Sequence, residues 1–209
     1  MNWVRKLFDR LQGAWLGWRI GSEVGKHPVT RLPLRVVFER IHRVKLEHRR
    51  ETGKAVLVLF DVNRLHDVNT ALGLAGGDII LWNLATLIRN KLRKCDLVWQ
   101  WGGDEILVLL DQTDLNGALS WVSRVEHSAR GLLQERDSEA YQELSHNMAE
   151  RLIAAGQEEK LGFIDYVFPM TGLAAGLAQW QREAGTFEAA LAQAGEMLRA
   201  HKATLQIAR

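Results

Sequence analysis

The sequence predicts an α+β domain, sandwich-like, in which helices pack on a central and mostly antiparallel β-sheet. Residues 55–62 (AVLVLFDV) form a continuous apolar run that ends in an acid, which is typical of a buried central strand. Residues 97–101 and 106–110 are two β-type runs joined by Gly102-Gly103-Asp104-Glu105, which is a hairpin signal. Helical patterns alternate with these strands, and this interleaving favours a sheet covered by helices.

The other elements follow from apolar periodicity and from glycine and proline punctuation. In chain order, we expect a helix over 34–50, a short helix over 66–72, a longer helix from 76 to about 92, helical structure over 114–157, a strand pair formed by 161–168 and 171–178 around Pro169, an amphipathic helix over 186–201, and a closing edge strand over 204–208.

Composition limits the function classes. The 209 residues, of which 47% are hydrophobic and 25% charged, suffice for one domain with a proper core. A net charge of +2 gives no electrostatic case for wrapping nucleic acid, so we expect no nucleic-acid partner. The one cysteine, Cys95, excludes an intramolecular disulfide and a cysteine-based zinc site. We expect a cytoplasmic protein, since no run of about 20 apolar residues is present.

Residues 1–26 are expected to form an N-terminal amphipathic helix and linker, with the main domain spanning 27–209. Tryptophan and leucine recur at helical spacing over residues 1–20, with basic residues between them. The segment lacks the unbroken apolar stretch and cleavage site of a signal peptide. Two interpretations stay open: docking on its own domain or a second copy, and a peripheral contact with a membrane interface.

Carboxylates cluster at the ends of the predicted strands. Asp61 ends the buried strand, while Asp104 and Glu105 lie at the hairpin tip. If those strands are neighbours, the three side chains converge at one sheet edge, where burial is costly unless a cation compensates. Mg²⁺, or Mn²⁺, is the natural candidate because it takes hard oxygen ligands and shares them with phosphates. The alternative is that these are solvated turn residues.

Several ordered motifs resemble the GGDEF family of diguanylate cyclases. These are Gly102–Ile106, Asp61–Asn69 followed by Gly73 and Gly77-Asp78, the entry residues Thr30, Leu32 and Arg35, the stretch Ala175–Ala178, and Lys202. The resemblance runs from about residue 27 to the C-terminus and implies the nucleotide-cyclase, palm-like fold. The segment from Asp111 to Lys160 is longer than is usual in that family.

The resemblance implies a Mg²⁺-dependent condensation of two GTP molecules into cyclic di-GMP by a homodimer. The 3′-hydroxyl of one GTP attacks the α-phosphate of the other and expels pyrophosphate. Asp61, Asp104 and the backbone carbonyl of Val62 are then expected to hold the metal ions, with Glu105 assisting. Asp104 also occupies the position proposed to take the proton of the hydroxyl.

The resemblance further implies a nucleotide subsite and an inhibitory site. Asn69 and Asp78 are expected to read the guanine edge, with helix capping as the alternative role. Leu65, His66 and Lys202 fall at the remaining positions expected to contact GTP. The catalytic candidates are therefore Asp104, Glu105 and His66.

Arg93 and Asp96 resemble the family's RxxD inhibitory site, which binds a product dimer. From the pattern alone, a solvated charge pair is an equal alternative. The spacing of this segment from the hairpin favours the functional interpretation.

The sequence departs from the family pattern mainly around the phosphates. His66 replaces a lysine, Leu74 a histidine, Leu65 a phenylalanine, Asn63 an aspartate, and Gln206 stands where an arginine is expected. Three hypotheses follow: an active cyclase whose rate is reduced, a non-catalytic module that binds GTP or cyclic di-GMP, and a dimerising or tethering domain.

Overall fold

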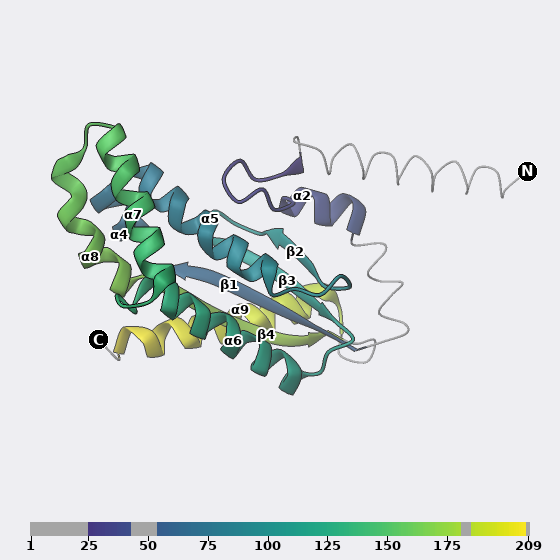
Figure 1. Ribbon diagram of the computed structural model, residues 1–209. Coiled ribbons are helices and arrows are strands. Elements are labelled where there is room, and N and C mark those ends of the chain that lie inside the picture. Colours follow the sequence, from purple (N-terminus) through teal and green to yellow (C-terminus); the bar gives the residue numbers. More distant parts are fainter. Residues whose placement is uncertain (1–24, 43–53, 181–184, 208–209) are drawn as a thin grey trace, which may run out of the picture.

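The computed structural model describes residues 25–42, 54–180 and 185–207 (Figure 1). Its centre is a four-stranded antiparallel sheet in the order β2-β3-β1-β4. The strands are β1 (Ala55–Asn63), β2 (Leu97–Gln100), β3 (Glu105–Asp111) and β4 (Gly172–Trp180). The predicted fold class, the central strand and the hairpin are thus confirmed.

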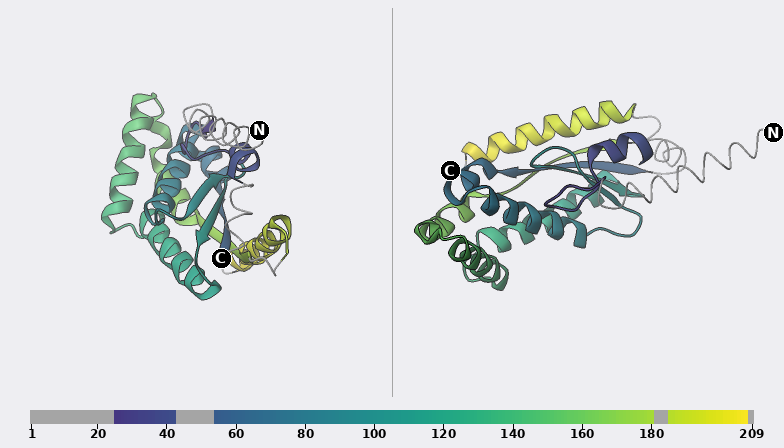
Figure 2. Two further views of the ribbon diagram at one scale, coloured as in Figure 1. Left: turned by 90° about the vertical axis from the view of Figure 1, so that its right-hand side faces the viewer. Right: turned by 90° about the horizontal axis from the view of Figure 1, so that it is seen from above.

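The helices lie on both faces of this sheet (Figures 1 and 2). Short helical turns α2 (Arg35–Val37) and η2 (Phe38–His42) precede β1, and α4 (Leu65–Leu72), α5 (Leu74–Asn90), α6 (Leu115–Leu133), α7 (Glu139–Ala154), η3 (Glu158–Phe163), α8 (Ile164–Val167), η4 (Phe168–Met170) and α9 (Phe187–Ile207) follow. In Figure 2, α9 covers one face of the sheet, while α5 and α6 cover the other. The sheet is therefore a buried middle layer.

Alternation along β1 explains why both faces are buried. Val56, Val58 and Phe60 belong to the core formed with α4, α5 and α6. Leu57 and Leu59 belong to the second core, beneath α9 and beside Trp99 and Phe38. Because successive strand side chains point to opposite faces, a continuous apolar run is required where helices cover both.

Gly176 sets how closely α9 approaches the sheet. A Cβ atom on this glycine would lie 1.9 Å from the carbonyl oxygen of Ala194 and 2.4 Å from the amide nitrogen of Leu198. No other residue fits there without moving the helix backbone. The close approach continues at His201, whose Nδ1 lies 3.2 Å from the amide nitrogen of Ala175.

Two predicted strands are wrong. Residues 161–168 form short helical turns, because Ile164, Val167 and Phe168 are buried at helical spacing rather than in alternation. Residues 204–207 are the last turn of α9, whose buried Ala194 and Leu198 continue with helical spacing to Leu205.

The first predicted helix is only partly described. Residues 35–42 are helical, while 43–50 lie outside the described residues. The predicted N-terminal helix over 1–20 also lies outside them. Among the helices described, none is long and apolar enough to cross a membrane.

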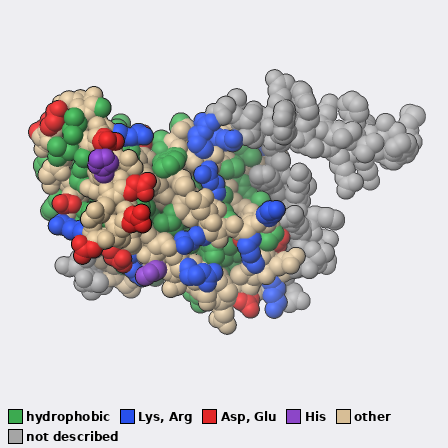
Figure 3. Space-filling view, in the orientation of Figure 1, with side chains coloured by type: hydrophobic (Ala, Val, Ile, Leu, Met, Phe, Trp, Pro, Cys, Tyr) green, Lys and Arg blue, Asp and Glu red, His purple; other side chains and the backbone are tan. Residues whose placement is uncertain are grey.

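Charge is unevenly distributed on the face seen in Figure 3. Most of the acidic side chains visible there lie at the end of the molecule that holds α7 and α8, while Lys and Arg side chains lie over its middle. Neither sign covers the face continuously.

Candidate active site at the β1 and β3 edge

Asp61 and the hairpin acids meet across adjacent strands, as the sequence predicts. Asp61 on β1 pairs directly with Glu105 on β3 in the antiparallel register. The amide nitrogen of Val62 donates a 3.2 Å hydrogen bond to the carbonyl oxygen of Asp104. Three carboxylate-bearing residues therefore share one edge of the sheet.

Asp61 is nearly enclosed and poorly satisfied. It is 6% exposed, and its Oδ1 accepts no well-directed hydrogen bond within the described residues. The Nζ of Lys202 forms an ion pair with this oxygen at 2.8 Å. Lys202 reaches it from α9, one residue beyond the contact of His201 with β4. The close approach allowed by Gly176 thus delivers a cation to the carboxylate.

The electrostatics of the edge favour an added positive charge. Burial raises the pKa of Asp61, the ammonium of Lys202 opposes this, and repulsion from Asp104 raises it further. Burial also raises the pKa of Glu105, as do the negative charges of Asp61 and Asp104. Carboxyl groups whose ionised forms are disfavoured in this way are relieved when a cation binds between them.

The chemistry of the donor set fits Mg²⁺ shared with a substrate. In the part of the chain that the structure describes, no group of three or more His, Cys, Asp or Glu side chains forms a ready-made metal cage. Mg²⁺ does not need one, because it retains waters and is held by one or two carboxylates together with substrate phosphates. Asp61, Asp104 and Glu105 supply carboxylates of that kind along one edge.

A cavity of about 340 Å³ opens beside this edge. It is lined by the side chains expected to contact nucleotide, namely Leu65, His66, Asn69, Asp78 and Asp104, together with His27, Leu74, Gly77, Leu81 and Gly103. Asp61, Glu105 and Lys202 are not among the lining residues, and they form the neighbouring carboxylate edge. The predicted site thus has two parts that meet at Asp104.

The packing of α4 against α5 positions the guanine-reading candidates. A Cβ atom at Gly77 would lie 1.8 Å from Oδ1 of Asn69, so glycine allows this amide to lie against the α5 backbone. The helix-capping alternative is wrong: Gly73 is the N-cap of α5, no side chain caps it, and Asp78 lies beyond the first turn. Asn69 and Asp78 are therefore available to the cavity.

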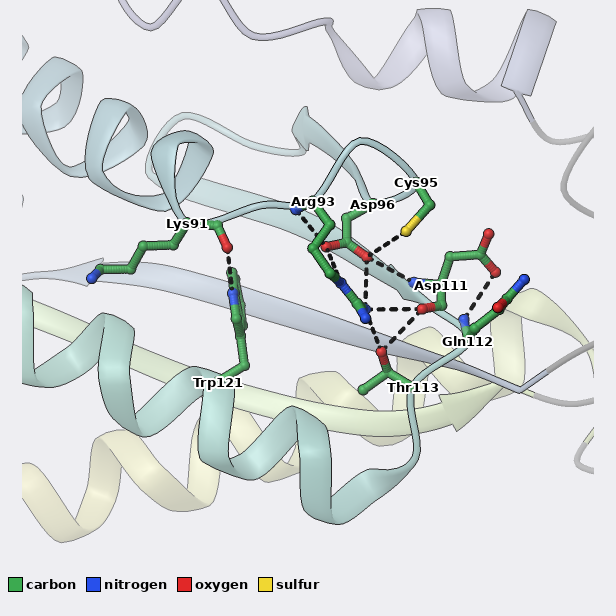
Figure 4. Close-up of polar contacts among 8 residues, drawn as sticks. All are labelled: Lys91, Arg93, Cys95, Asp96, Asp111, Gln112, Thr113 and Trp121. Carbon is green, nitrogen blue, oxygen red and sulfur yellow. Dashed lines mark hydrogen bonds and ion pairs between the residues drawn. The ribbon is translucent and has the colours of Figure 1, made fainter.

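The Arg93–Asp96 segment is a tightly bonded loop rather than a solvated charge pair (Figure 4). Asp96 is 7% exposed and accepts hydrogen bonds from the backbone nitrogen and guanidinium of Arg93 and from the amide of Asp111. Arg93 also donates to the carbonyl oxygen of Asp111 and, at 2.6 Å, to Thr113 Oγ1. The side chain of Arg93 is 57% exposed, so part of it faces solvent.

Comparisons with known proteins decide the family. The family model described as "Diguanylate cyclase, GGDEF domain" matches residues 27–150, which is more than half of the chain. The chain belongs to the GGDEF family. The diguanylate cyclase TpbB of Pseudomonas aeruginosa is 40% identical over 83 residues, which are 39% of this chain and 19% of that relative.

Solved GGDEF structures have the same fold. The GGDEF domain of TpbB from P. aeruginosa superposes with a TM-score of 0.59 at 27% identity, covering 86% of this chain and 89% of that one. The GGDEF domain of DgcB from Caulobacter crescentus, in complex with c-di-GMP, gives 0.65 at 15% identity, covering 87% and 92%. The chain thus corresponds to the GGDEF part and to about a fifth of the full TpbB relative.

Two residues of this GGDEF site were not found from the sequence. His27 lines the cavity, and burial lowers its pKa although the charge of Asp78 opposes this. His27 lies three residues before the entry residue Thr30, but no motif position named from the sequence falls on it. Gln100 is buried directly behind the hairpin tip. A polar residue at the end of an otherwise apolar strand is the one signal that could have singled it out.

Proposed function

We propose that this GGDEF domain binds GTP and condenses two molecules into cyclic di-GMP with Mg²⁺ or Mn²⁺. The observation that carries the proposal is the buried, poorly satisfied Asp61 paired with Glu105 beside a cavity that Asp104, Asn69 and Asp78 line. Naming of relatives as diguanylate cyclases supports the same reaction.

Each side chain then has a separate task. Asn69 and Asp78 bind the guanine edge, because a carboxylate accepts from both N1–H and the exocyclic amine, which adenine does not offer together. Leu65 packs beside the nucleotide, and His66 faces it in place of a lysine. Asp104 accepts the proton of the attacking 3′-hydroxyl.

The carboxylate edge would hold the metal through Asp61, Asp104, Glu105 and the carbonyl of Val62. The bound ion supplies charge neutralisation for the triphosphate. Lys202 pairs with Asp61, and its ammonium would be available to contact a phosphate if the ion took over that charge.

A homodimer follows from the reaction itself. The attacking hydroxyl and the attacked phosphate belong to different GTP molecules, and Leu65, His66, Asn69 and Asp78 of one chain line a single shared cavity. A second copy therefore brings the second nucleotide. Initial rates that rise with the square of protein concentration at low concentration would support this.

The decisive assay incubates purified protein with GTP and Mg²⁺ and identifies products by mass spectrometry. We expect cyclic di-GMP and the linear intermediate pppGpG, with ATP giving neither. Absence of both products at high protein concentration, with Mg²⁺ or Mn²⁺, would exclude the catalytic proposal.

Product inhibition at Arg93 and Asp96 is the regulatory part of the proposal. The exposed side chain of Arg93 suits a guanine or phosphate, since the planar fork of a guanidinium offers paired donors. Its bonds to Asp111 and Thr113 must loosen for such binding, which predicts weak inhibition. Calorimetry with cyclic di-GMP on wild type and Arg93→Ala measures it.

One observation favours a second function, that of a binding module without turnover. Leu74 is 75% exposed and lines the cavity where the family has a histidine, and His66 replaces a lysine beside it. The lysine replaced by His66 and the arginine replaced by Gln206 are both cationic. Loss of these two contacts lowers turnover, on the order of 10²-fold, more than it lowers guanine binding. Binding of GTP or cyclic di-GMP without product formation would select this function.

A further inference from the structure

The hairpin that carries Asp104 and Glu105 is held from behind by one buried amide. Gln100, which is 2% exposed, directs its Nε2 toward three carbonyl oxygens of the turn. The distances are 3.0 Å to Gly102, 3.1 Å to Gly103 and 3.3 Å to Glu105. The two N–H groups of the amide are therefore shared among the carbonyls that shape the tip.

The other side of the same amide is anchored in the entry segment. Oε1 of Gln100 accepts a 2.8 Å hydrogen bond from Oγ1 of Thr30, which is 1% exposed. That hydroxyl in turn accepts from the amide of Leu32 at 3.4 Å. Thr30 and Gln100 thus form a buried relay from residues 25–34 to the hairpin, 70 positions away in sequence.

Backbone and aromatic contacts fix the same junction. The backbone amide nitrogen of Gln100 donates a 2.8 Å hydrogen bond to the carbonyl oxygen of Pro33, and Leu34 forms a parallel β-bridge with Gln100. Next to it, the Arg35 guanidinium lies 4.6 Å from the centroid of Trp101. Residues 33–35 therefore contact both residues that directly precede the Gly-Gly turn.

Backbone hydrogen bonds also hold the turn: the amides of Trp101 and Gly102 donate to the carbonyl oxygen of Glu105, and the amide of Val62 donates to that of Asp104. A Cβ atom placed on Gly103 would meet no heavy atom within 4 Å, so this face of the tip is open. Two successive glycines also have wide conformational freedom. Among the side chains of the described residues, Gln100 is the one that bonds to the carbonyl oxygens of both glycines, so it adds to the backbone bonds that place Asp104 relative to Asp61.

We propose that Gln100 is a positioning residue for the acidic hairpin and that Thr30 is its anchor, so that the entry segment sets the placement of Asp104. The inference rests on the proposed cyclase function, in which a displacement of about 1 Å can reduce the rate on the order of 10²-fold. Neither side chain lines the cavity, so both act through the hairpin.

The test compares Thr30→Val, which removes the hydroxyl with little change of shape, with Thr30→Ser, which keeps it. Thr171→Val is the matched control, because the Thr171 hydroxyl is equally buried but donates to Val167, away from the hairpin. A fourth variant, Gln100→Leu, removes the relay completely. Hydrogen exchange of the hairpin amides and steady-state kinetics are measured for each full-length variant.

In Thr30→Val, exchange of the Trp101 and Gly102 amides, which bond to Glu105, is expected to accelerate roughly fivefold. We expect kcat to fall about tenfold while KM for GTP changes little. Thr30→Ser restores both quantities. Thr171→Val lowers the melting temperature without changing either, and the effects of Thr30→Val and Gln100→Leu are not additive.

If the hairpin amides of folded Thr30→Val exchange hydrogen at the wild-type rate, Thr30 and Gln100 do not hold the hairpin and the proposal fails. Faster exchange with unaltered kcat would overturn their role in positioning. If the wild type makes no product, the cyclase proposal fails separately. The positioning role of Thr30 and Gln100 is then tested by hydrogen exchange of the hairpin amides and by the affinity for Mn²⁺–GTP. A loss of affinity in Thr30→Val but not in Thr171→Val would support this role, and equal affinities would overturn it.

Discussion

Asp61 and Asp96 are both almost enclosed, at 6% and 7% exposed, yet their surroundings are opposite. Asp96 accepts bonds from Arg93 and from the amide of Asp111, so its two oxygens are well satisfied. Asp61 has an oxygen without a well-directed donor and one ion pair, from Lys202. The carboxylate of Asp96 holds its own loop together, while that of Asp61 lies beside Asp104 and Glu105.

This difference in hydrogen bonding implies that the carboxylate of Asp96 stabilises the fold, whereas the carboxylate of Asp61 lowers its stability. A buried charge that is fully hydrogen-bonded rigidifies its surroundings, whereas a poorly satisfied one is costly in the free chain. Such a cost is tolerated where a ligand relieves it. Burial with few partners, rather than burial alone, is therefore what distinguishes Asp61, the proposed metal ligand, from Asp96.

The largest expected effect is on turnover. Replacing Asp61 or Asp104 with asparagine should lower cyclic di-GMP formation on the order of 10²-fold or more, because a charge that holds the ion is lost. Exposed Asp137, replaced in the same way, serves as the charge-matched control. Chromatography of the nucleotides after incubation with GTP measures all three. Near-normal turnover in Asp61→Asn would contradict the assignment.

The next effect is on stability, with opposite signs at the two aspartates. Asp96→Asn should lower the free energy of unfolding by about 2 kcal/mol, because it weakens charge-assisted bonds in a buried loop. Asp61→Asn should leave it unchanged or raise it in metal-free buffer, since the buried charge disappears. Urea denaturation with a chelator present compares them. Equal losses in both variants would show that Asp61 is as well satisfied as Asp96.

A smaller effect concerns pH. The pKa of Asp61 is raised in the folded chain above its ordinary value of 3.8, so the folded state holds the proton more tightly than the unfolded state. The corresponding stability is present below about pH 4 and is lost as pH rises through the raised pKa. Asp61→Asn removes this dependence, so the wild type should become less stable relative to the variant as pH rises.

Glu105 and Glu126 have raised pKa values too. The difference in stability between wild type and Asp61→Asn, measured from pH 3.5 to 8, cancels the contribution of Glu126 and reports Asp61 together with its effect on Glu105. A difference that stays constant across this range would refute the role of its buried charge.

The smallest expected effect follows from Lys202. Lys202→Met removes the cation that pairs with Asp61, so the metal-free protein should melt a few degrees lower. Added Mg²⁺ should then raise the melting temperature more than in the wild type, because the ion takes over that charge. Lys94→Met, near the Asp96 loop, is the control. A Mg²⁺ response identical in the wild type and both variants would contradict this account.

Much of this comparison was accessible from sequence, because the signals were local. The apolar run before Asp61 predicts a buried strand, and the glycines before Asp104 predict a hairpin between two others. That the Asp61 strand lies beside the hairpin was only a condition at that point, and the register of β1 with β3 meets it. The Leu161–Phe168 segment was misassigned because a short apolar run does not separate strand from helix unless its spacing is weighed. There, burial at helical spacing decided the outcome.

What sequence could not provide was the set of long-range partners. The contact of Lys202 with Asp61 depends on how closely α9 crosses β4, which Gly176 permits only in the folded chain. The bond between Thr30 and Gln100 joins residues 70 positions apart, and neither belongs to a charged motif. Such contacts are set by packing, and no local pattern encodes them.

We propose above that the poorly satisfied carboxylate edge binds a divalent ion together with GTP. Titration of Mn²⁺ followed by electron paramagnetic resonance, in the presence of GTPαS, tests it directly on wild type, Asp61→Asn and Asp96→Asn. The account predicts that Asp61→Asn loses most of the nucleotide-dependent Mn²⁺ binding, whereas Asp96→Asn retains it. Equal binding by wild type and Asp61→Asn would contradict the account.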